Sequence, residues 1–278
     1  MPTVKKTGTK TRTKSPSRSS RRKSSLRDKM IDVRDMDHPY VKMTVWGRSG
    51  SGKTYFCASM PKPLLMIGAE EGTNTIRKVE GITFLPISNV EEAQEALEIA
   101  REDEFASLVV DTGTSCQQVF LADHLGLDQM PAQSSWGLAS REDYQTVSMQ
   151  VKTFFRDCFS LPMHTVIIAQ EREFETDDST ELISPSVGAE LFPSTARWLY
   201  ANSDYIVQTY IRERYIEKKI KVAGKTKIKK VLDPDKKCEF CLRMGPDAVY
   251  VTKWRAPPGT ELPDMIVDPT FEKISEYL

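Results

Sequence analysis

The chain has 278 residues, in which 39 Lys and Arg side chains balance 39 Asp and Glu side chains and 39% of the residues are apolar. No apolar run approaches the ~20 residues of a membrane-spanning helix, so the sequence excludes a membrane span. The charge is unevenly distributed. Residues 1–27 carry ten basic and no acidic side chains, which leaves a net charge of −10 on the rest of the chain. This asymmetry predicts a polyanionic partner for the basic segment.

Composition divides the chain into two regions. Residues 1–37 are highly charged and poor in apolar side chains, which predicts a disordered basic tail. Residues 38–278 have the length and apolar content of one α/β domain. The five cysteines are an odd number scattered along the chain, which favours a reducing compartment, and hence the cytoplasm, over a secreted disulfide framework.

The predicted elements alternate between short apolar strands and helices. In chain order they are a strand at 40–46, a helix at 54–60, a strand at 64–67, a helix at 90–101, a strand at 107–111, a helix at 140–159 and a strand at 164–169. Four more strands are predicted at 204–210, 215–222, 227–232 and 249–253. The alternation predicts an α/β fold with a mainly parallel, doubly wound sheet, and the later strands predict an antiparallel C-terminal part.

A glycine-rich loop separates the first strand from the first helix. Its residues match the pattern G-x-x-x-x-G-K-[ST]: Gly47, Arg48, Ser49, Gly50, Ser51, Gly52, Lys53 and Thr54. Glycines allow consecutive backbone N–H groups to turn toward phosphates, the lysine supplies a cation and the threonine hydroxyl binds Mg²⁺. The sequence therefore predicts a phosphate-binding P-loop.

Three further polar positions follow apolar strands. Asp111 ends the strand at 107–111 and is the expected Mg²⁺ acid, because a P-loop site needs a carboxylate near the metal. Thr112 occupies the place where many P-loop ATPases carry the catalytic glutamate, so we expect Glu70 or Glu71, and prefer Glu71, as the base for the attacking water. Gln170 follows the strand at 164–169 and is the expected sensor of the γ-phosphate.

The expected ligands are ATP and Mg²⁺. A guanine-specific site would contain Asn-Lys-x-Asp, and no Asn in this chain is followed by Lys. Trp254, Tyr40 and Tyr55 are all candidates for stacking on adenine, and the sequence does not choose among them.

With these residues, the chain resembles the RecA-like branch of the P-loop ATPases, and more narrowly the phage-encoded AAA/RecA-type ATP-binding proteins that act as single-strand annealing recombinases. The resemblance covers about residues 38–275 and rests on the P-loop and on the segments PKPLLMIGAEEGT, SLVVDT and HTVIIAQERE. It implies the base at Glu71 and the sensor at Gln170. It also implies that Lys253 and Arg255 reach the ATP site of a neighbouring subunit in a homo-oligomer.

Several segments bear on the partner. Residues 212–230 hold nine basic and two acidic side chains, a net charge of +7, and are predicted to form a basic hairpin. Such a hairpin suits either DNA binding or a solvated sheet edge.

Residues 171–181, where a full recombinase has a DNA-binding loop, carry a net charge of −5 and would repel phosphates. Cys238 and Cys241 have zinc-knuckle spacing without a second ligand pair, which favours paired strand cysteines.

We therefore expect a Mg²⁺-dependent ATPase that acts on DNA, in particular single-stranded DNA, in phage recombination or replication, within the host-cell cytoplasm. The tail at 1–27 and the hairpin at 212–230 are its expected DNA contacts. The alternatives are a nucleotide-gated DNA-binding or scaffolding protein with little turnover, and a packaging or helicase-type motor.

Overall fold

The computed structural model of the chain describes residues 30, 40–70, 72–127, 139–174, 186–222, 225–257 and 259–278. The chain divides after His38, and every helix and strand described below lies in residues 39–278. Of the predicted tail at 1–37, all residues but Met30 lie outside the described part.

A twisted sheet with a parallel centre organises the domain. Its main strands are β1 (Lys42–Gly47), β2 (Leu64–Gly68), β3 (Ile82–Pro86), β4 (Ser107–Val110), β5 (His164–Glu173), β7 (Tyr205–Glu213), β10 (Cys238–Arg243) and β12 (Met265–Val267), in the spatial order β12-β10-β7-β1-β5-β4-β2-β3. The strands from β3 to β7 in this order are parallel, whereas β10 and β12 are antiparallel to their neighbours. Two short strands flank the sheet: β6 (Val187–Ala189) on β5 and β11 (Lys253–Trp254) on β7.

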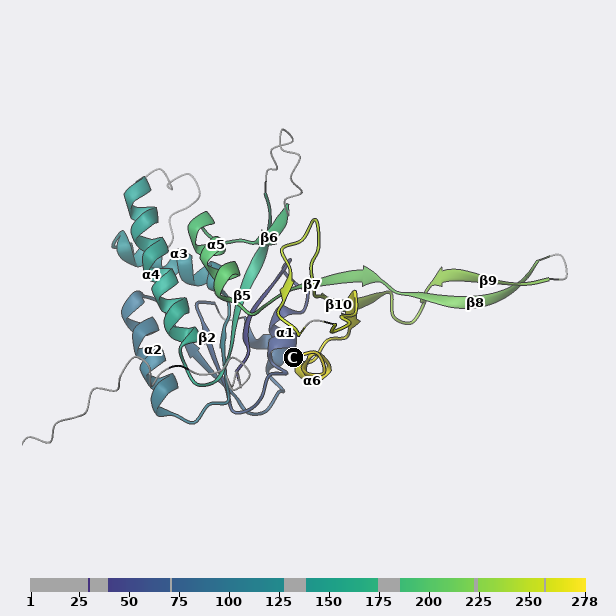
Figure 1. Ribbon diagram of the computed structural model, residues 1–278, viewed down its shortest axis with the longest axis horizontal. Helices are drawn as coiled ribbons and strands as arrows, with labels where there is room; N and C mark the ends of the chain where they lie inside the picture. Colours follow the sequence, from purple (N-terminus) through teal and green to yellow (C-terminus); the bar gives the residue numbers. More distant parts are fainter. Residues whose placement is uncertain are drawn as a thin grey trace, which may run out of the picture. The chain divides into compact units, whose positions relative to one another are not determined.

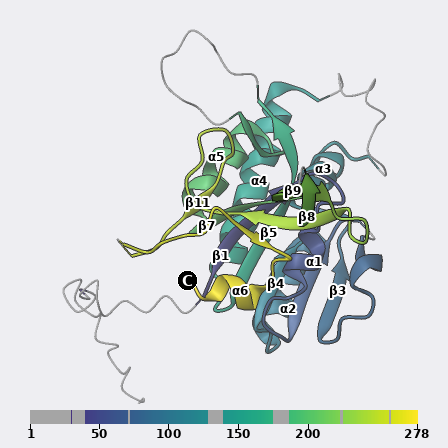
Figure 2. The same ribbon diagram turned by 90° about the vertical axis from the view of Figure 1, so that its right-hand side faces the viewer.

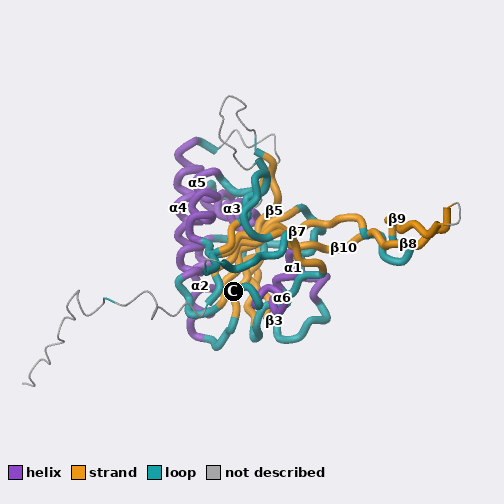
Figure 3. The backbone as a smooth tube through the Cα atoms, turned by 45° about the vertical axis from the view of Figure 1, so that its right-hand side comes forward, coloured by secondary structure: helices purple, strands orange, loops and turns teal. Residues whose placement is uncertain are grey.

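Helices cover both faces of this sheet (Figures 1 and 3). One face carries α2 (Val90–Glu102), α3 (Gly113–His124), α4 (Arg141–Phe159) and α5 (Pro193–Asn202), and the other carries α1 (Lys53–Cys57) and α6 (Phe271–Ser275). A 3-10 helix, η3 (Thr73–Ile76), follows β2. Successive side chains of β2 alternate between the two cores: Leu65 and Ile67 pack under the four-helix face, and Leu64 and Met66 under α1 and α6.

Short polar side chains define where the longer helices begin. Asn89 Oδ1 accepts a hydrogen bond from the backbone N–H of Glu92 at the start of α2, and Thr112 caps α3 in the same way. Ser140 and Asp143 form a capping box at the start of α4. These caps satisfy N–H groups that have no partner within the helix.

A two-stranded arm extends from the sheet. It consists of β8 (Tyr215–Val222) and β9 (Lys225–Leu232), which continue from β7 and lead back to β10. The arm projects away from the sheet in Figure 1 and comes toward the viewer in Figure 2. The predicted basic hairpin is therefore confirmed as a β-ribbon.

The structure corrects one predicted strand. Residues 249–253 were expected to form a continuous strand, but the strand β11 begins at Lys253 and ends at Trp254, and Arg255 lies beyond it. The preceding residues pair elsewhere: Val249 accepts backbone hydrogen bonds from Ser186 and Val187, and Val251 donates one to Val187. The segment therefore crosses from β6 to β7 instead of pairing along one neighbour.

Candidate active site

The predicted P-loop lies between β1 and α1, where two of its glycines adopt backbone conformations that side chains disfavour. Gly50 has φ 78° and Gly52 has φ 89°, both in the left-handed region. At Gly47 a Cβ atom would lie 2.2 Å from the carbonyl oxygen of Thr209, so only glycine fits. The loop from Ser49 to Thr54 lines a cavity of about 770 Å³.

Lys53 holds its ammonium group inside this loop. Its Nζ donates hydrogen bonds to the carbonyl oxygens of Gly47 at 2.7 Å and Arg48 at 2.9 Å, and to Gln170 Oε1 at 2.9 Å. The side chain is buried, and burial lowers the pKa of Lys53, an effect that the nearby Asp111 carboxylate opposes. The cation therefore sits at the loop, beside the predicted sensor.

Thr54 and Asp111 meet at the same edge of the sheet. Thr54 Oγ1 donates a hydrogen bond to Asp111 Oδ2 at 2.7 Å. Burial raises the pKa of Asp111, and the hydrogen bond from Thr54 and the charge of Lys53 act in the opposite direction. A hydroxyl and a carboxylate at this spacing form the oxygen pair that Mg²⁺ uses in P-loop sites.

The carboxyl ends of the parallel strands explain why these residues converge. Gln170 on β5 is in register with Gly47 at the end of β1, and Asp111 directly follows β4. In open parallel sheets ligands bind at this edge. The structure therefore brings the predicted site residues Lys53, Thr54, Asp111 and Gln170 together at one edge of the sheet.

Of the two candidates for the catalytic base, the structure describes only Glu70. Glu71 lies outside the described residues. Glu70 lines the cavity, and its Oε1 accepts a hydrogen bond from Ser115 Oγ at 2.6 Å. Thr112 Oγ1 lies 2.8 Å from the same Ser115 hydroxyl. The carboxylate of Glu70 is thus held by the first turn of α3.

The far wall of the cavity comes from the C-terminal part of the chain, which sequence reasoning missed. Its lining residues are Lys236, Phe240, Asp268, Pro269 and Thr270. Phe240 lies on β10 and is 41% exposed. No motif in the sequence singles out these positions, because they reach the P-loop through the strand order and not through spacing along the chain.

Three aromatic residues were predicted as candidates for stacking on adenine. Of these, only Tyr55 lines this cavity. Trp254 is buried, and its Nε1 donates a hydrogen bond to the carbonyl oxygen of Tyr277. Tyr40 precedes β1 and therefore lies at the opposite end of that strand from the P-loop.

Lys253 and Arg255 lie at the other end of the sheet. Lys253 pairs with Ile206 at the start of β7, whereas the P-loop follows the end of the adjacent parallel strand β1. Lys253 Nζ donates hydrogen bonds to the carbonyl oxygens of Tyr200 at 2.9 Å and Ser203 at 2.6 Å, at the end of α5. Arg255 is exposed and forms an ion pair with Asp204 at 2.6 Å. Neither residue belongs to the P-loop cavity of its own chain.

The arm carries the basic residues of the predicted DNA interface. At its base, Arg212 pairs with Glu239, and Arg214 Nε lies 3.1 Å from Asp233 Oδ2. Further along, the backbone register pairs Lys218 with Lys229 and Glu217 with Lys230. The side chains of Lys218, Lys229 and Lys230 are exposed. The tail at 1–27 lies outside the described residues.

The cysteines form no metal site in the part of the chain that the structure describes. All five are free, and Cys238 is exposed on β10 whereas Cys241 is buried. No group of three or more His, Cys, Asp or Glu side chains among the described residues is arranged to hold a metal ion.

The donor set fits ATP and Mg²⁺. The left-handed glycines leave the loop without side chains where phosphates would approach, and the Lys53 ammonium offers a cation there. Thr54 and Asp111 supply hard oxygen ligands of the kind that Mg²⁺ prefers.

Comparison with known proteins identifies the family. A family model described as an AAA domain matches residues 40–256. The chain belongs to this AAA-domain family. No curated protein matches the sequence.

Two solved structures are similar to this AAA domain. The flagellar accessory protein FlaH from Methanocaldococcus jannaschii has a TM-score of 0.41 and 9% identity, with 82% of this chain and 86% of FlaH covered. The RadB recombinase has a TM-score of 0.36 and 15% identity, with 61% of this chain and 74% of RadB covered.

The family and the strand order confirm the predicted fold class, an α/β P-loop domain with a mainly parallel sheet and antiparallel C-terminal strands. Among the residues that the structure describes, none of the helices of this AAA domain is both long enough and apolar enough to cross a membrane.

Proposed function

We propose that this AAA domain is a Mg²⁺-dependent ATPase that acts on single-stranded DNA in phage recombination or replication, in the host-cell cytoplasm. The observation that carries the ATPase proposal is the convergence of Lys53, Thr54, Asp111 and Gln170 at one edge of the sheet. Each of the four has a polar partner among the others, and each has the chemistry that phosphoryl transfer requires.

In this mechanism the chain mainly positions and neutralises charge. Mg²⁺, when bound, stabilises charge on the phosphate oxygens. Lys53 offers its ammonium group to the β- and γ-phosphates, and Gln170, which contacts Lys53, senses the γ-phosphate. Glu71 is the proposed base that takes a proton from the attacking water, with Glu70 as the alternative.

A second cation is proposed to come from a neighbouring subunit. The P-loop cavity has no lining contribution from Lys253 or Arg255, which lie at the opposite end of the sheet. In a homo-oligomer they would reach the next subunit's ATP site only if that site packs against this end of the sheet and their present contacts are exchanged. Their contacts with α5 and Asp204 support the alternative, in which they have only a structural role.

The charge distribution supports DNA as the partner. The tail at 1–27 and the segment at 212–230 concentrate positive charge on an otherwise acidic chain. The arm presents exposed lysines on a projecting β-ribbon, which suits contact with a phosphate backbone (Figure 1).

One contact favours the nucleotide-gated alternative. The segment that connects the arm to β10 includes Lys236, which lines the nucleotide cavity and pairs with Asp268 at 3.0 Å. A ligand on the arm and a nucleotide in the cavity would therefore act on the same connector, so each would change the affinity of the other.

Turnover measurements separate these functions. The ATPase proposal predicts Mg²⁺-dependent hydrolysis that single-stranded DNA stimulates. A gated binding protein would show ATP-dependent DNA affinity with negligible hydrolysis, and a motor would unwind or translocate duplex DNA in one direction. Tight ATP binding without hydrolysis, with or without DNA, would reject the ATPase proposal in favour of gating.

A further inference from the structure

Phe240 places an aromatic ring beside the P-loop. It occupies an exposed position on β10, between the buried residues Glu239 and Cys241, and it lines the nucleotide cavity. A Cβ atom on Gly52 would lie 3.1 Å from Phe240 Cδ1, so the ring lies directly beside the loop. Phe240 is 41% exposed, so its ring contributes little to the hydrophobic core. Because the ring lies in the wall of the cavity, it is available to pack against a ligand there.

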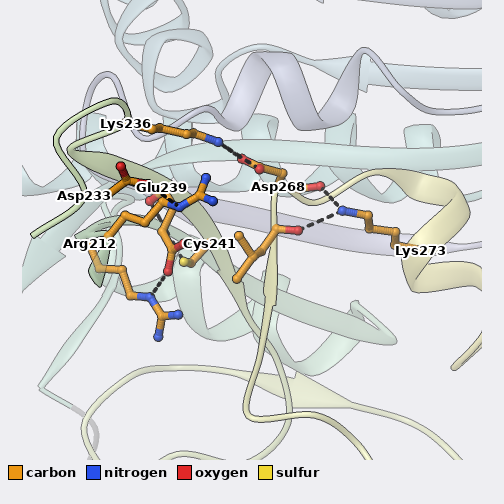
Figure 4. A network of polar contacts seen from close by, with 9 residues as sticks. Arg212, Asp233, Lys236, Glu239, Cys241, Asp268 and Lys273 are labelled. Atoms are coloured by element: carbon orange, nitrogen blue, oxygen red, sulfur yellow. Dashed lines mark hydrogen bonds and ion pairs between the residues drawn. The ribbon is translucent and has the colours of Figure 1, made fainter. Parts of the chain in front are cut away.

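The segment next to Phe240 is held in place by several contacts (Figure 4). The backbone N–H of Asp268 donates to the carbonyl oxygen of Phe240 at 2.8 Å, and Lys236 Nζ lies 3.0 Å from the Asp268 carboxylate. Lys273 Nζ donates to the carbonyl oxygens of Val267 and Asp268 at 2.8 and 2.7 Å.

A further contact ties this segment to α1. The backbone N–H of Phe271 donates to Ser59 Oγ at 2.7 Å, just beyond the end of α1. Because α1 starts at the P-loop, the wall formed by Phe240, Asp268 and Pro269 has a fixed position relative to the loop. A fixed wall binds a planar ligand without a large ordering cost.

The cavity is large enough for more than phosphates. Its volume of about 770 Å³ is in the range of sites for whole small molecules, and it extends from the P-loop to Phe240 and Pro269. A nucleoside triphosphate whose phosphates occupy the P-loop must place its ribose and base in the remaining space. The ring-bearing residues that line the cavity are Tyr55, Phe56, Phe240 and Pro269, and of these Phe56 is buried in the core beneath α1.

We infer that Phe240 and Pro269 form the nucleobase subsite, in which the planar face of a purine stacks on the ring of Phe240. The Lys236–Asp268 pair lies at the polar rim of this subsite and contacts the hydrophilic edge of the base or the ribose. The inference rests on the proposed function, because it concerns the nucleotide whose phosphates bind the P-loop.

Tyr55 is the competing platform. It lies on α1, is 63% exposed and lines the same cavity. Its ring is not held by the β10 and α6 contacts that fix the wall at Phe240. The two aromatic residues therefore make opposite predictions when each is replaced.

The test measures Mg²⁺-dependent binding of ATP and of inorganic tripolyphosphate to the full chain by calorimetry. Phe240→Ala should weaken ATP binding about ten-fold or more, the scale of one base–aromatic stack, and leave tripolyphosphate binding unchanged. Phe240→Tyr should retain wild-type ATP affinity because it keeps the ring. Phe240→Leu, which keeps apolar bulk without the ring, should behave like Phe240→Ala.

Each other outcome has a distinct meaning. If Phe240→Ala weakens both ligands equally, Phe240 supports the P-loop and is not a base platform. If only Tyr55→Ala weakens ATP binding, the base stacks on Tyr55 and the inference is wrong. If wild-type protein binds neither ligand, the proposed function itself fails. Thermal unfolding of each variant shows whether the fold is retained.

Discussion

Thr54 Oγ1 and Asp111 Oδ2 lie 2.7 Å apart and join the first turn of α1 to the end of β4. The strand β1 that precedes the P-loop and the strand β4 that precedes Asp111 are not neighbours, because β5 lies between them. This single contact fixes the distance between the P-loop and the acidic strand end. It also places the two oxygens that would hold Mg²⁺ side by side.

Asp111→Asn should raise the Mg²⁺ concentration needed for half-maximal hydrolysis. The amide keeps the shape of the side chain and can still accept the hydrogen bond from Thr54, but it lacks the negative charge that attracts the metal. A Mg²⁺ titration of ATPase activity checks this. An unchanged titration curve would show that Asp111 does not act through the metal.

Glu71→Gln should reduce turnover by ~10²-fold or more while ATP still binds, because the amide cannot take the proton from water. Glu70→Gln should have a smaller effect, since the amide oxygen can still accept the hydrogen bond from Ser115. Single-turnover hydrolysis and ATP binding are measured for both variants. The reverse order of effects would assign the base to Glu70.

Arg255→Ala should lose turnover but keep ATP binding if Arg255 completes a neighbour's site. Asp204→Ala is the matched control, because it breaks the same ion pair and leaves the arginine in place. Mixing Arg255→Ala with Lys53→Ala subunits should restore some activity, since one interface in the mixture has both groups. Equal effects of Arg255→Ala and Asp204→Ala, without restoration on mixing, would leave Arg255 a structural role.

Reversing charge on the arm should weaken binding of single-stranded DNA and reduce its salt dependence. A triple change of Lys218, Lys229 and Lys230 to Glu removes exposed cations, and each lost phosphate contact lowers the slope of log K against log salt by about 0.7. Deletion of residues 1–37 should also weaken binding, without a change in basal hydrolysis.

Arg141→Glu is the charge-matched control for a single arm change such as Lys218→Glu. Arg141 is exposed at the start of α4. The helix α4 lies on the face of the sheet that also carries α2, α3 and α5 (Figure 3). Fluorescence anisotropy at several salt concentrations reads out both effects. If binding is the same for the arm variant, the tail deletion and wild type, DNA is not the partner of these surfaces.

The sequence could predict that the P-loop residues, Asp111 and Gln170 lie close together because the signals for them are local. The P-loop motif fixes Lys53 and Thr54 within eight residues. Asp111 directly follows the run LVV of β4, and Gln170 directly follows the run VIIA within β5. Parallel strands place their carboxyl ends at one edge, so a correct fold class was enough to bring these residues together.

The C-terminal wall of the cavity was not predictable by the same reasoning. Phe240 and Asp268 reach the P-loop through antiparallel strands and short irregular segments, whose pairing depends on tertiary contacts. The helix α3 was also missed, because it buries side chains on several sides and lacks a single apolar stripe. The strand expected at 249–253 shows the same limit, since its residues are mostly β-branched or aromatic but pair with two different neighbours.

The central claim is that this AAA domain hydrolyses ATP through the P-loop cation, and the most direct measurement is steady-state hydrolysis of Mg²⁺-ATP by wild type and Lys53→Ala. The claim predicts turnover by wild type and none above background for Lys53→Ala, with similar thermal unfolding of both proteins, because the Lys53 ammonium contacts loop carbonyls and Gln170 but no part of the apolar core. Undiminished turnover by a folded Lys53→Ala protein would contradict it.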